Sequence, residues 1–280
     1  MCSFLQLSHT EVKWLAQNRT LLDSYTILFL GDVVGKPGRT IVGQGLPSLK
    51  DTYKPLFTIV NGENSAGGVG ITPSIADEIY SAGADAITLG NHAFNKRDIG
   101  PYLDSGKPIV RPSNMPPEVP GSGLCSVTKE GIELAVMNVC GRVYMDSYGD
   151  PFAEVDQLLS GLDTQHRFLD FHGEATSEKI AMGWHCNGRC TAVVGTHTHV
   201  TTADERVLPD GTAYITDVGM SGPRDSVLGM DRHLILRRFR TTLPEKFEVS
   251  NEPGVISGVV IRVLRETGRA LSIERIRFGD

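Results

Sequence analysis

The stretch VVGTHTHV, from Val193 to Val200, places an apolar run directly before two histidines. Its first two residues are typical of a buried β-strand, and the glycine that follows marks the point where such a strand ends. His197 and His199 are one residue apart, and alternate residues of an extended chain point the same way. The stretch therefore predicts a buried strand whose carboxyl end presents two imidazole rings toward one place.

Short apolar runs alternate with stretches of helical periodicity along much of the chain, which is the pattern of βαβ units. We expect strands at residues 26–30, 56–60, 85–89, 168–171 and 191–195. We expect helices at residues 39–50, 71–83, 151–162 and 175–185. Hairpins are expected at residues 126–139 and 258–278, and mostly β structure is expected after residue 200.

This order of elements predicts an α/β fold with two packed sheets and helices outside them. We expect residues 26–280 to form a single domain, because no linker, repeat or low-complexity tract interrupts them. Residues 1–25 are expected to be an amino-terminal extension, either a short helix packed on the domain or a segment with no catalytic part.

Polar residues follow each of five expected strands at the point where the strand ends. These residues are Asp32, Glu63, Asn64, Asn91, His92, His172, His197 and His199. In an α/β sheet the carboxyl ends of parallel strands line one crevice, so side chains far apart in sequence can converge there. A lone aspartate after a strand is usually a helix cap or a turn former. The recurrence at five strand ends indicates a shared site instead.

The donor atoms of this set are carboxylate oxygens, carboxamide oxygens and imidazole nitrogens, with no thiolate among them. Such a mixture suits Fe, Mn or Zn, and it is large enough for two ions. A carboxylate such as Glu63 could bridge the pair. The HCNGRC stretch at residues 185–190 has a single C-x3-C spacing, which fits an ordinary helix-end turn better than a structural zinc site.

The bulk composition limits the class of partner. A formal net charge of −6 provides no field that attracts nucleic acid, so we expect no nucleic-acid groove. The five cysteines are odd in number and sparse in 280 residues, which favours reduced thiols and a cytoplasmic location. No run of about twenty apolar residues occurs, so no membrane span is expected. A homo-oligomer is compatible with the sequence.

Several long motifs are familiar when taken together. LFLGDVVGKPGR, IVNGENSAGGVGIT, ITLGNHAFNK, DFHGEATSEK and the block from VVGTHTHV to DSVLGM resemble the YmdB-like branch of the calcineurin-like metallophosphoesterases. The resemblance covers residues 26–280. It implies a four-layer α-β-β-α sandwich, a two-metal centre that is often di-iron, and phosphodiesterase activity toward cyclic nucleotides, notably 2′,3′-cyclic AMP.

The resemblance also implies a role for each strand-end residue. The residues implied to hold the first ion are Asp32, Glu63, Asn64 and His199. Those implied to hold the second ion are Glu63 as the bridge, Asn91, His172 and His197. His92 is implied to be the proton donor. The expected cofactor is a pair of divalent or trivalent ions, iron before manganese or zinc, and the expected substrate is a small phosphate ester.

The motifs depart from the more usual patterns in two places. Val34 stands where the wider superfamily often has a histidine, and Glu63 stands where an aspartate commonly bridges; both match this branch. GNHAFN replaces the more usual GNHTWD, and we expect Ala93, Phe94 and Asn95 to flank the pocket and to affect substrate preference. Arg224 remains open between contacting substrate phosphate and pairing with its neighbour.

The expected chemistry is attack by a metal-bridging hydroxide, with His92 giving a proton to the leaving oxygen. A nucleotidase or other phosphomonoesterase is the alternative within enzymes, because the same nucleophile can attack either ester. The alternative outside enzymes is a regulatory protein that binds metal and nucleotide with little turnover.

Overall fold

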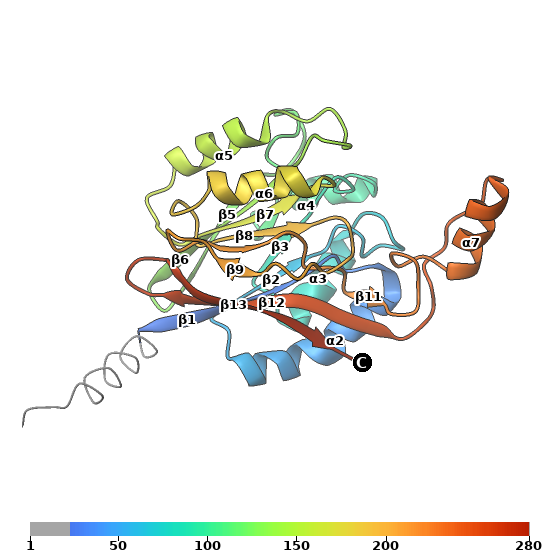
Figure 1. The fold of residues 1–280 in the computed structure, drawn as a ribbon, viewed down its shortest axis with the longest axis horizontal. Coiled ribbons are helices and arrows are strands. Elements are labelled where there is room, and N and C mark those ends of the chain that lie inside the picture. Colours follow the sequence, from blue (N-terminus) through green and yellow to red (C-terminus); the bar gives the residue numbers. More distant parts are fainter. Residues whose placement is uncertain (1–22, 280) are drawn as a thin grey trace, which may run out of the picture.

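The computed structural model describes residues 23–279 as two sheets packed face to face, with helices on both outer faces (Figure 1). β1 begins at Ser24, two residues before its expected start, and the predictions for residues 1–22 lie outside the described residues. No helix within residues 23–279 combines the length and the apolar character needed to cross a membrane.

The first sheet has seven strands in the order β11-β12-β1-β2-β3-β4, with β13 paired to β12. The strands are β1 (Ser24–Leu30), β2 (Phe57–Asn61), β3 (Ala86–Thr88), β4 (Ile109–Val110), β11 (Gly222–Pro223), β12 (Gly254–Leu264) and β13 (Ala270–Phe278). β1 to β4 are parallel to one another, whereas β12 is antiparallel to β1. The carboxyl ends of three early strands therefore lie at one edge.

The second sheet has six strands in the order β5-β6-β7-β8-β10-β9. The strands are β5 (Leu124–Lys129), β6 (Ile132–Cys140), β7 (Arg167–His172), β8 (Ala192–Thr196), β9 (Arg206–Val207) and β10 (Ala213–Ile215). β6, β7, β8 and β10 run parallel, while the β5–β6 hairpin is antiparallel as expected. The second hairpin, β12–β13, is also confirmed.

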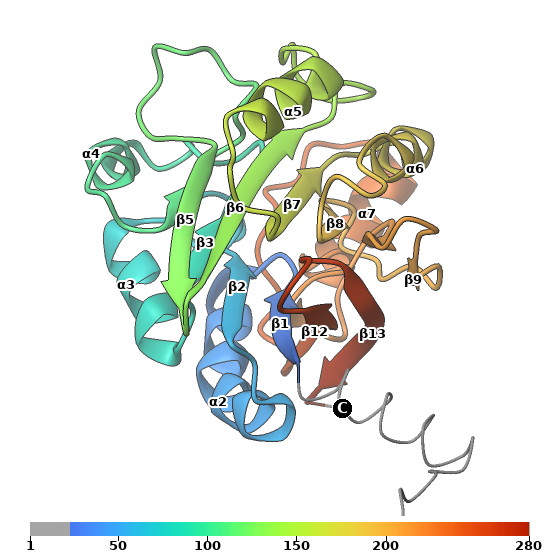
Figure 2. The same ribbon diagram turned by 90° about the vertical axis from the view of Figure 1, so that its left-hand side faces the viewer.

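Helices cover the outer face of each sheet, which gives the four expected layers (Figure 2). On the first sheet these are α2 (Gly35–Tyr53), α3 (Pro73–Ala82) and α4 (Gly100–Leu103), the last preceded by the 3₁₀ turn η1 (Arg97–Ile99). On the second sheet they are α5 (Pro151–Ser160) and α6 (Thr176–His185). The four-layer α-β-β-α sandwich is confirmed.

Three apolar clusters hold the layers together. The largest lies between the two sheets, where Phe29 of β1 meets Phe168 of β7 with ring centroids 5.2 Å apart. A second cluster lies beneath α2 and α3 and includes Leu46, and a third lies beneath α5 and α6 and includes Met182. Burial of apolar surface on both faces of each sheet explains why the strands are near-continuous apolar runs.

Three helical segments were not expected from the sequence, namely η1, α4 and α7. α7 (Arg232–Thr241) lies in the region expected to be mostly β, outside the four layers (Figure 1). Asp231 caps its first turn by accepting from two backbone N–H groups. Ile235 is its buried residue, while Leu236 and Phe239 are exposed. Four of its ten residues are arginines and it buries only Ile235, so its short apolar part was not recognised as a helix among the expected strands.

Candidate metal centre

The carboxyl ends of β1, β2 and β3 in one sheet and of β7 and β8 in the other meet at the same edge of the sandwich. The structure brings all the candidate site residues together there. They are Asp32, Glu63, Asn64, Asn91, His92, His172, His197 and His199, and hydrogen bonds or close polar contacts link each to another member.

His172 lies at the centre of this cluster and is fully buried. Its Nε2 is 2.9 Å from Oδ1 of Asn91, 3.2 Å from Oε1 of Glu63 and 3.1 Å from Nδ1 of His197. Its Nδ1 is 3.9 Å from Oδ1 of Asp32. Among residues 23–279, Glu63, His172 and His197 form a group whose ligand atoms all lie within 4.8 Å of one another.

The remaining members border the Glu63 carboxylate. Nδ2 of Asn64 donates to Oε1 of Glu63 over 2.8 Å and lies 3.1 Å from Nε2 of His199. The backbone N–H of His92 donates to Oε2 of Glu63 over 3.1 Å. Both carboxylate oxygens therefore face other members of the cluster, as a bridging group requires.

Two oxygen atoms in the cluster are buried without a hydrogen-bond partner. They are Oδ1 of Asp32 and Oδ1 of Asn64. An unsatisfied buried acceptor costs about 1–3 kcal/mol, and more when it is charged. A cation would satisfy both atoms, and the surrounding donors are oxygens and imidazole nitrogens of the kind that bind Fe, Mn or Zn. The residues present therefore fit a metal centre.

Burial and mutual charge set the proton positions in the cluster. Burial raises the pKa of Glu63, but the His172 imidazole outweighs this and holds it at about 2. Burial lowers the pKa of His172, but the Glu63 carboxylate raises it to about 9. Burial and then His172 lower the pKa of His197 to about 3, and burial raises that of Asp32. His172 thus carries the positive charge that pairs with Glu63.

The loop that carries His197 and His199 has an uncommon backbone. His197 has a φ of 100° and His199 has a φ of 65°, values that residues other than glycine rarely adopt. Thr198 between them is held from both its N–H and its hydroxyl by Oδ2 of Asp217, at 3.0 and 2.8 Å. Such strain persists where surrounding contacts fix it, and here it aims two rings at the cluster.

The GNHAFN segment differs in part from expectation. Ala93 is fully buried in the cluster beneath α3, and Phe94 packs against the same cluster, so neither flanks the pocket. Oδ1 of Asn95 lies 3.3 Å from Nδ1 of His92. The carboxamide accepts the Nδ1 proton, which leaves Nε2 of His92 on the side of Asn91.

A pocket of about 320 Å³ opens over the cluster. Glu63, Asn64, His92, His197 and His199 contribute polar groups to its wall, and Leu228 and Met230 contribute apolar ones. Arg224 is ion-paired with its neighbour Asp225 at 3.3 Å, which favours the pairing alternative for that side chain.

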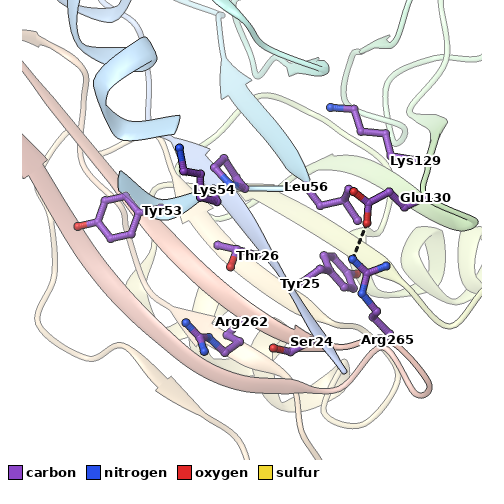
Figure 3. Close-up of a pocket in the computed structure, with 11 residues that line it drawn as sticks. Ser24, Tyr25, Thr26, Tyr53, Lys54, Leu56, Lys129, Glu130, Arg262 and Arg265 are labelled. Carbon is purple, nitrogen blue, oxygen red and sulfur yellow. Dashed lines mark hydrogen bonds and ion pairs between the residues drawn. The ribbon is translucent and has the colours of Figure 1, made fainter. Parts of the chain in front are cut away.

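A larger pocket, of about 810 Å³, lies at the opposite ends of the strands (Figure 3). Its wall includes Ser24 at the start of β1, whereas Asp32 follows the end of the same strand. Four of its five charged residues are already paired, since Arg265 binds Glu130, Lys129 binds Asp85 and Lys54 binds Asp51. It contains none of the candidate site residues.

Four residues around the cluster were missed as site residues in the sequence. Oε2 of Glu174 lies 3.1 Å from Nε2 of His197 and lines the pocket. Asp170, Asp217 and Lys179 are buried behind the cluster. A carboxylate inside the apolar run FLDF was the available signal for Asp170.

Comparison with known proteins identifies the family of this chain. The sequence profile of a family described as "YmdB-like protein" matches residues 28–276. The chain belongs to the YmdB-like family. A 2′,3′-cyclic-nucleotide 2′-phosphodiesterase of Bacillus subtilis (strain 168) is 52% identical over 256 residues, which cover 91% of this chain and 97% of that protein.

Solved structures confirm the fold. A crystal structure described as a novel phosphatase of Mycoplasma pneumoniae is 36% identical, with a TM-score of 0.86, and the match covers 91% of this chain and 93% of that one. Haemophilus influenzae NAD nucleotidase is 14% identical with a TM-score of 0.56, over 91% of this chain and 56% of that one, which shows the fold alone. The sandwich is the calcineurin-like metallophosphoesterase fold.

Proposed function

We propose that this chain is a binuclear-metal phosphodiesterase that hydrolyses 2′,3′-cyclic nucleotides. The observation that carries the proposal is the 52% identity to a Bacillus subtilis enzyme named for that reaction, across 97% of that enzyme's length. On this relationship the chain is a phosphoric ester hydrolase. The cluster of oxygen and nitrogen donors with two orphaned oxygens supports a metal-dependent mechanism.

Two groups of side chains would hold the ions. The first group is Asp32, Glu63, Asn64 and His199, and the second is Glu63, Asn91, His172 and His197. Glu63 belongs to both, since its two oxygens face different members of the cluster. Iron is the proposed metal, although manganese and zinc share these ligands.

Bound ions of this kind lower the pKa of a water molecule and neutralise charge on a phosphoryl oxygen. In the reaction, the water loses a proton to solvent, its oxygen forms a bond to phosphorus, and the bond from phosphorus to O2′ breaks. O2′ takes up a proton, and the product is a 3′-phosphomonoester.

His92 is the proposed donor of that proton. It lines the pocket, and Asn95 accepts its Nδ1 proton, so the proton that His92 would give is the one that its imidazolium form carries on Nε2. A proton delivered by a positioned side chain is worth on the order of 10²- to 10⁴-fold in rate.

The wall of the pocket also supports a nucleoside substrate. Leu228 is about half exposed, and together with Met230 it forms an apolar side next to the polar cluster. The backbone carbonyl of Leu228 accepts from Nδ1 of His199 over 3.0 Å, which ties this side of the pocket to the cluster. A base or ribose can lie against it while the phosphate faces the ligands.

The test compares hydrolysis of 2′,3′-cyclic AMP, 3′,5′-cyclic AMP and 5′-AMP by purified full-length protein, with its metal content measured by elemental analysis. We expect two equivalents of metal and release of 3′-AMP from the 2′,3′-cyclic ester. Glu63→Gln keeps the side-chain shape but removes the charge, and we expect it to lose both metal and activity.

Two outcomes would replace the proposal. Faster turnover of 5′-AMP than of either cyclic ester would make the chain a phosphomonoesterase, a reading supported by the phosphatase description of the Mycoplasma pneumoniae relative. Two equivalents of metal with no turnover of any ester would favour a regulatory protein that binds metal and nucleotide.

A cytoplasmic location belongs to the same proposal. Four cysteines within residues 23–279, namely Cys125, Cys140, Cys186 and Cys190, are free thiols. Free thiols persist in a reducing compartment.

A further inference from the structure

A carboxylate is buried behind the metal centre, at the interface between the two sheets. Asp170 lies in β7, two residues before His172, and is fully buried. A buried carboxylate is expensive unless donors surround it. The hydrogen bonds of its two carboxylate oxygens therefore indicate its role in the structure.

Three donors from both sheets converge on Asp170. Its Oδ1 accepts from the hydroxyl of Thr196 in β8 over 2.6 Å. Its Oδ2 accepts from Nδ2 of Asn61 in β2 over 2.9 Å and from the hydroxyl of Thr88 in β3 over 2.5 Å. β2 and β3 belong to the first sheet and β8 to the second, so Asp170 ties the sheets together at the edge where the ligands meet.

The contact with Thr196 fixes the tautomer of His172. A threonine hydroxyl has one proton, and that of Thr196 is directed to Asp170. In its 2.8 Å contact with Nδ1 of His172, the same oxygen must therefore accept, so Nδ1 donates. Because Nδ1 keeps its proton, Nε2 is the nitrogen that would give up its proton to bind a metal ion, and it is Nε2 that faces Asn91 and Glu63.

The contact with Asn61 acts on the other sheet. Nδ2 of Asn61 donates to Asp170 and to the carbonyl of Leu89, at 2.9 and 3.2 Å. Its Oδ1 is thereby turned toward the backbone N–H of Glu63, from which it accepts over 3.1 Å. The backbone of Glu63 is thus held, through Asn61, by the same Asp170 carboxylate that holds the ring of His172 through Thr196.

We propose that Asp170 is a positioning residue that sets the metal affinity of the centre, by fixing Nε2 of His172 through Thr196 and the backbone of Glu63 through Asn61. The proposal rests on the metal ligands of the proposed function, and it does not depend on the substrate. Partners that orient a ligand in this way typically change metal affinity by about 10- to 100-fold.

Two threonines provide a matched test. Thr196 and Thr88 are both fully buried, and both donate to Asp170, but Thr88 contacts no ligand side chain through its hydroxyl. Thr196→Val and Thr88→Val therefore remove the same kind of hydrogen bond from the same carboxylate. Thr196→Ser restores the hydroxyl.

The measurement is Mn²⁺ binding to the metal-stripped full-length chain by titration calorimetry. We expect Thr196→Val to weaken Mn²⁺ binding by about 10- to 100-fold. Thr88→Val should stay within about threefold of the parent, and Thr196→Ser should recover most of the affinity. The urea midpoints of the two valine variants should be similarly lowered, because each loses one buried hydrogen bond.

Three results would overturn the proposal. They are an equal loss of Mn²⁺ affinity in both valine variants, parental affinity in Thr196→Val, and no Mn²⁺ binding by the parent chain. The outcome is separable from that of the proposed function. A chain that binds Mn²⁺ as expected but cleaves no cyclic ester would contradict the proposed substrate and leave the role of Asp170 intact.

Discussion

Replacing Lys179 by methionine should destabilise the protein through a single buried ion pair. Nζ of Lys179 in α6 lies 2.6 Å from Oδ2 of Asp217, and each side chain is 1% exposed. Asp217 also accepts from both groups of Thr198 and, through Oδ1, from the N–H of Gly219 over 2.8 Å. The substitution would leave this carboxylate buried without its counter-ion.

The size of the effect follows from what remains around Asp217. Removing one partner of a buried pair costs about 3–5 kcal/mol, because the other charge is left uncompensated. Three donors from Thr198 and Gly219 would still reach Asp217, so we expect the lower end, about 3 kcal/mol in free energy of unfolding.

The same substitution should weaken metal binding. Asp217 holds Thr198, and Thr198 stands between His197 and His199 in their uncommon backbone conformation. Without Lys179 the Asp217 carboxylate is fixed only by Thr198 and Gly219, so it orients Thr198, and with it both imidazoles, less firmly. Mn²⁺ titration of the metal-stripped variant should therefore show lower affinity, together with the lower stability.

Urea unfolding of metal-stripped protein measures the stability effect. Lys54→Met is the matched control, because the Lys54–Asp51 pair has side chains that are 75% and 86% exposed. Exposed ion pairs contribute about 0–1 kcal/mol, so Lys54→Met should leave the free energy of unfolding nearly unchanged. A loss below about 1 kcal/mol for Lys179→Met, or equal losses in the two variants, would refute the reasoning.

Three further predictions concern the cluster itself. Burial lowers the pKa of His172, but Glu63 raises it to about 9. The protonated ring therefore contributes its whole share of the free energy of unfolding below the unfolded pKa near 6.5, and this contribution is lost as the pH rises through 9. Urea unfolding of metal-stripped protein should show a loss on the order of 2 kcal/mol between about pH 6.5 and 8.5. A flat profile, or an equal slope in His172→Gln, would contradict this. Gly90→Ala would place a Cβ 2.2 Å from Oε2 of Glu63 and 2.5 Å from Nε2 of His172, so metal content by elemental analysis should fall, whereas Gly43→Ala, with open space around it, should leave it unchanged. Glu174→Gln should weaken Mn²⁺ binding by less than about tenfold, because its partly exposed carboxylate orients His197 in a pair that solvent screens; a loss as large as that of Glu63→Gln would show that Glu174 is itself a ligand.

The site residues at the strand ends could be predicted from the sequence, because each is marked by the residues next to it in the chain. Asp32, Glu63, Asn91, His172 and His197 each end or closely follow an apolar run, and parallel strands bring such positions to one edge. The expected hairpins were readable for the same reason. Each depends on neighbours in the chain and on turn residues between them.

The residues that position the ligands could not be predicted from the sequence, because their hydrogen-bond partners lie on other helices, strands or loops. Asp170 and Asn61 are 109 residues apart and meet across the joint between the sheets. Inside the run FLDF, an aspartate gives no indication of what faces it. The conformation of His197 and His199 is likewise set by Asp217, which lies on a later segment. α7 was missed because arginines make up four of its ten residues.

The two sheets supply different halves of the centre, and this division links metal binding to the fold. The first sheet provides the oxygen donors of Asp32, Glu63, Asn64 and Asn91. The second provides the imidazoles of His172, His197 and His199.

Neither half alone offers a bridging carboxylate together with nitrogen ligands, so a small slide of one sheet over the other would separate the ligand sets. The apolar cluster between the sheets resists separation but fixes no register by itself, because apolar contacts are non-directional. Directional hydrogen bonds donated by Asn61 and Thr88 to Asp170 supply that register. Metal binding should in turn stabilise the sandwich, since an ion that bridges both halves binds the folded chain and not the unfolded one.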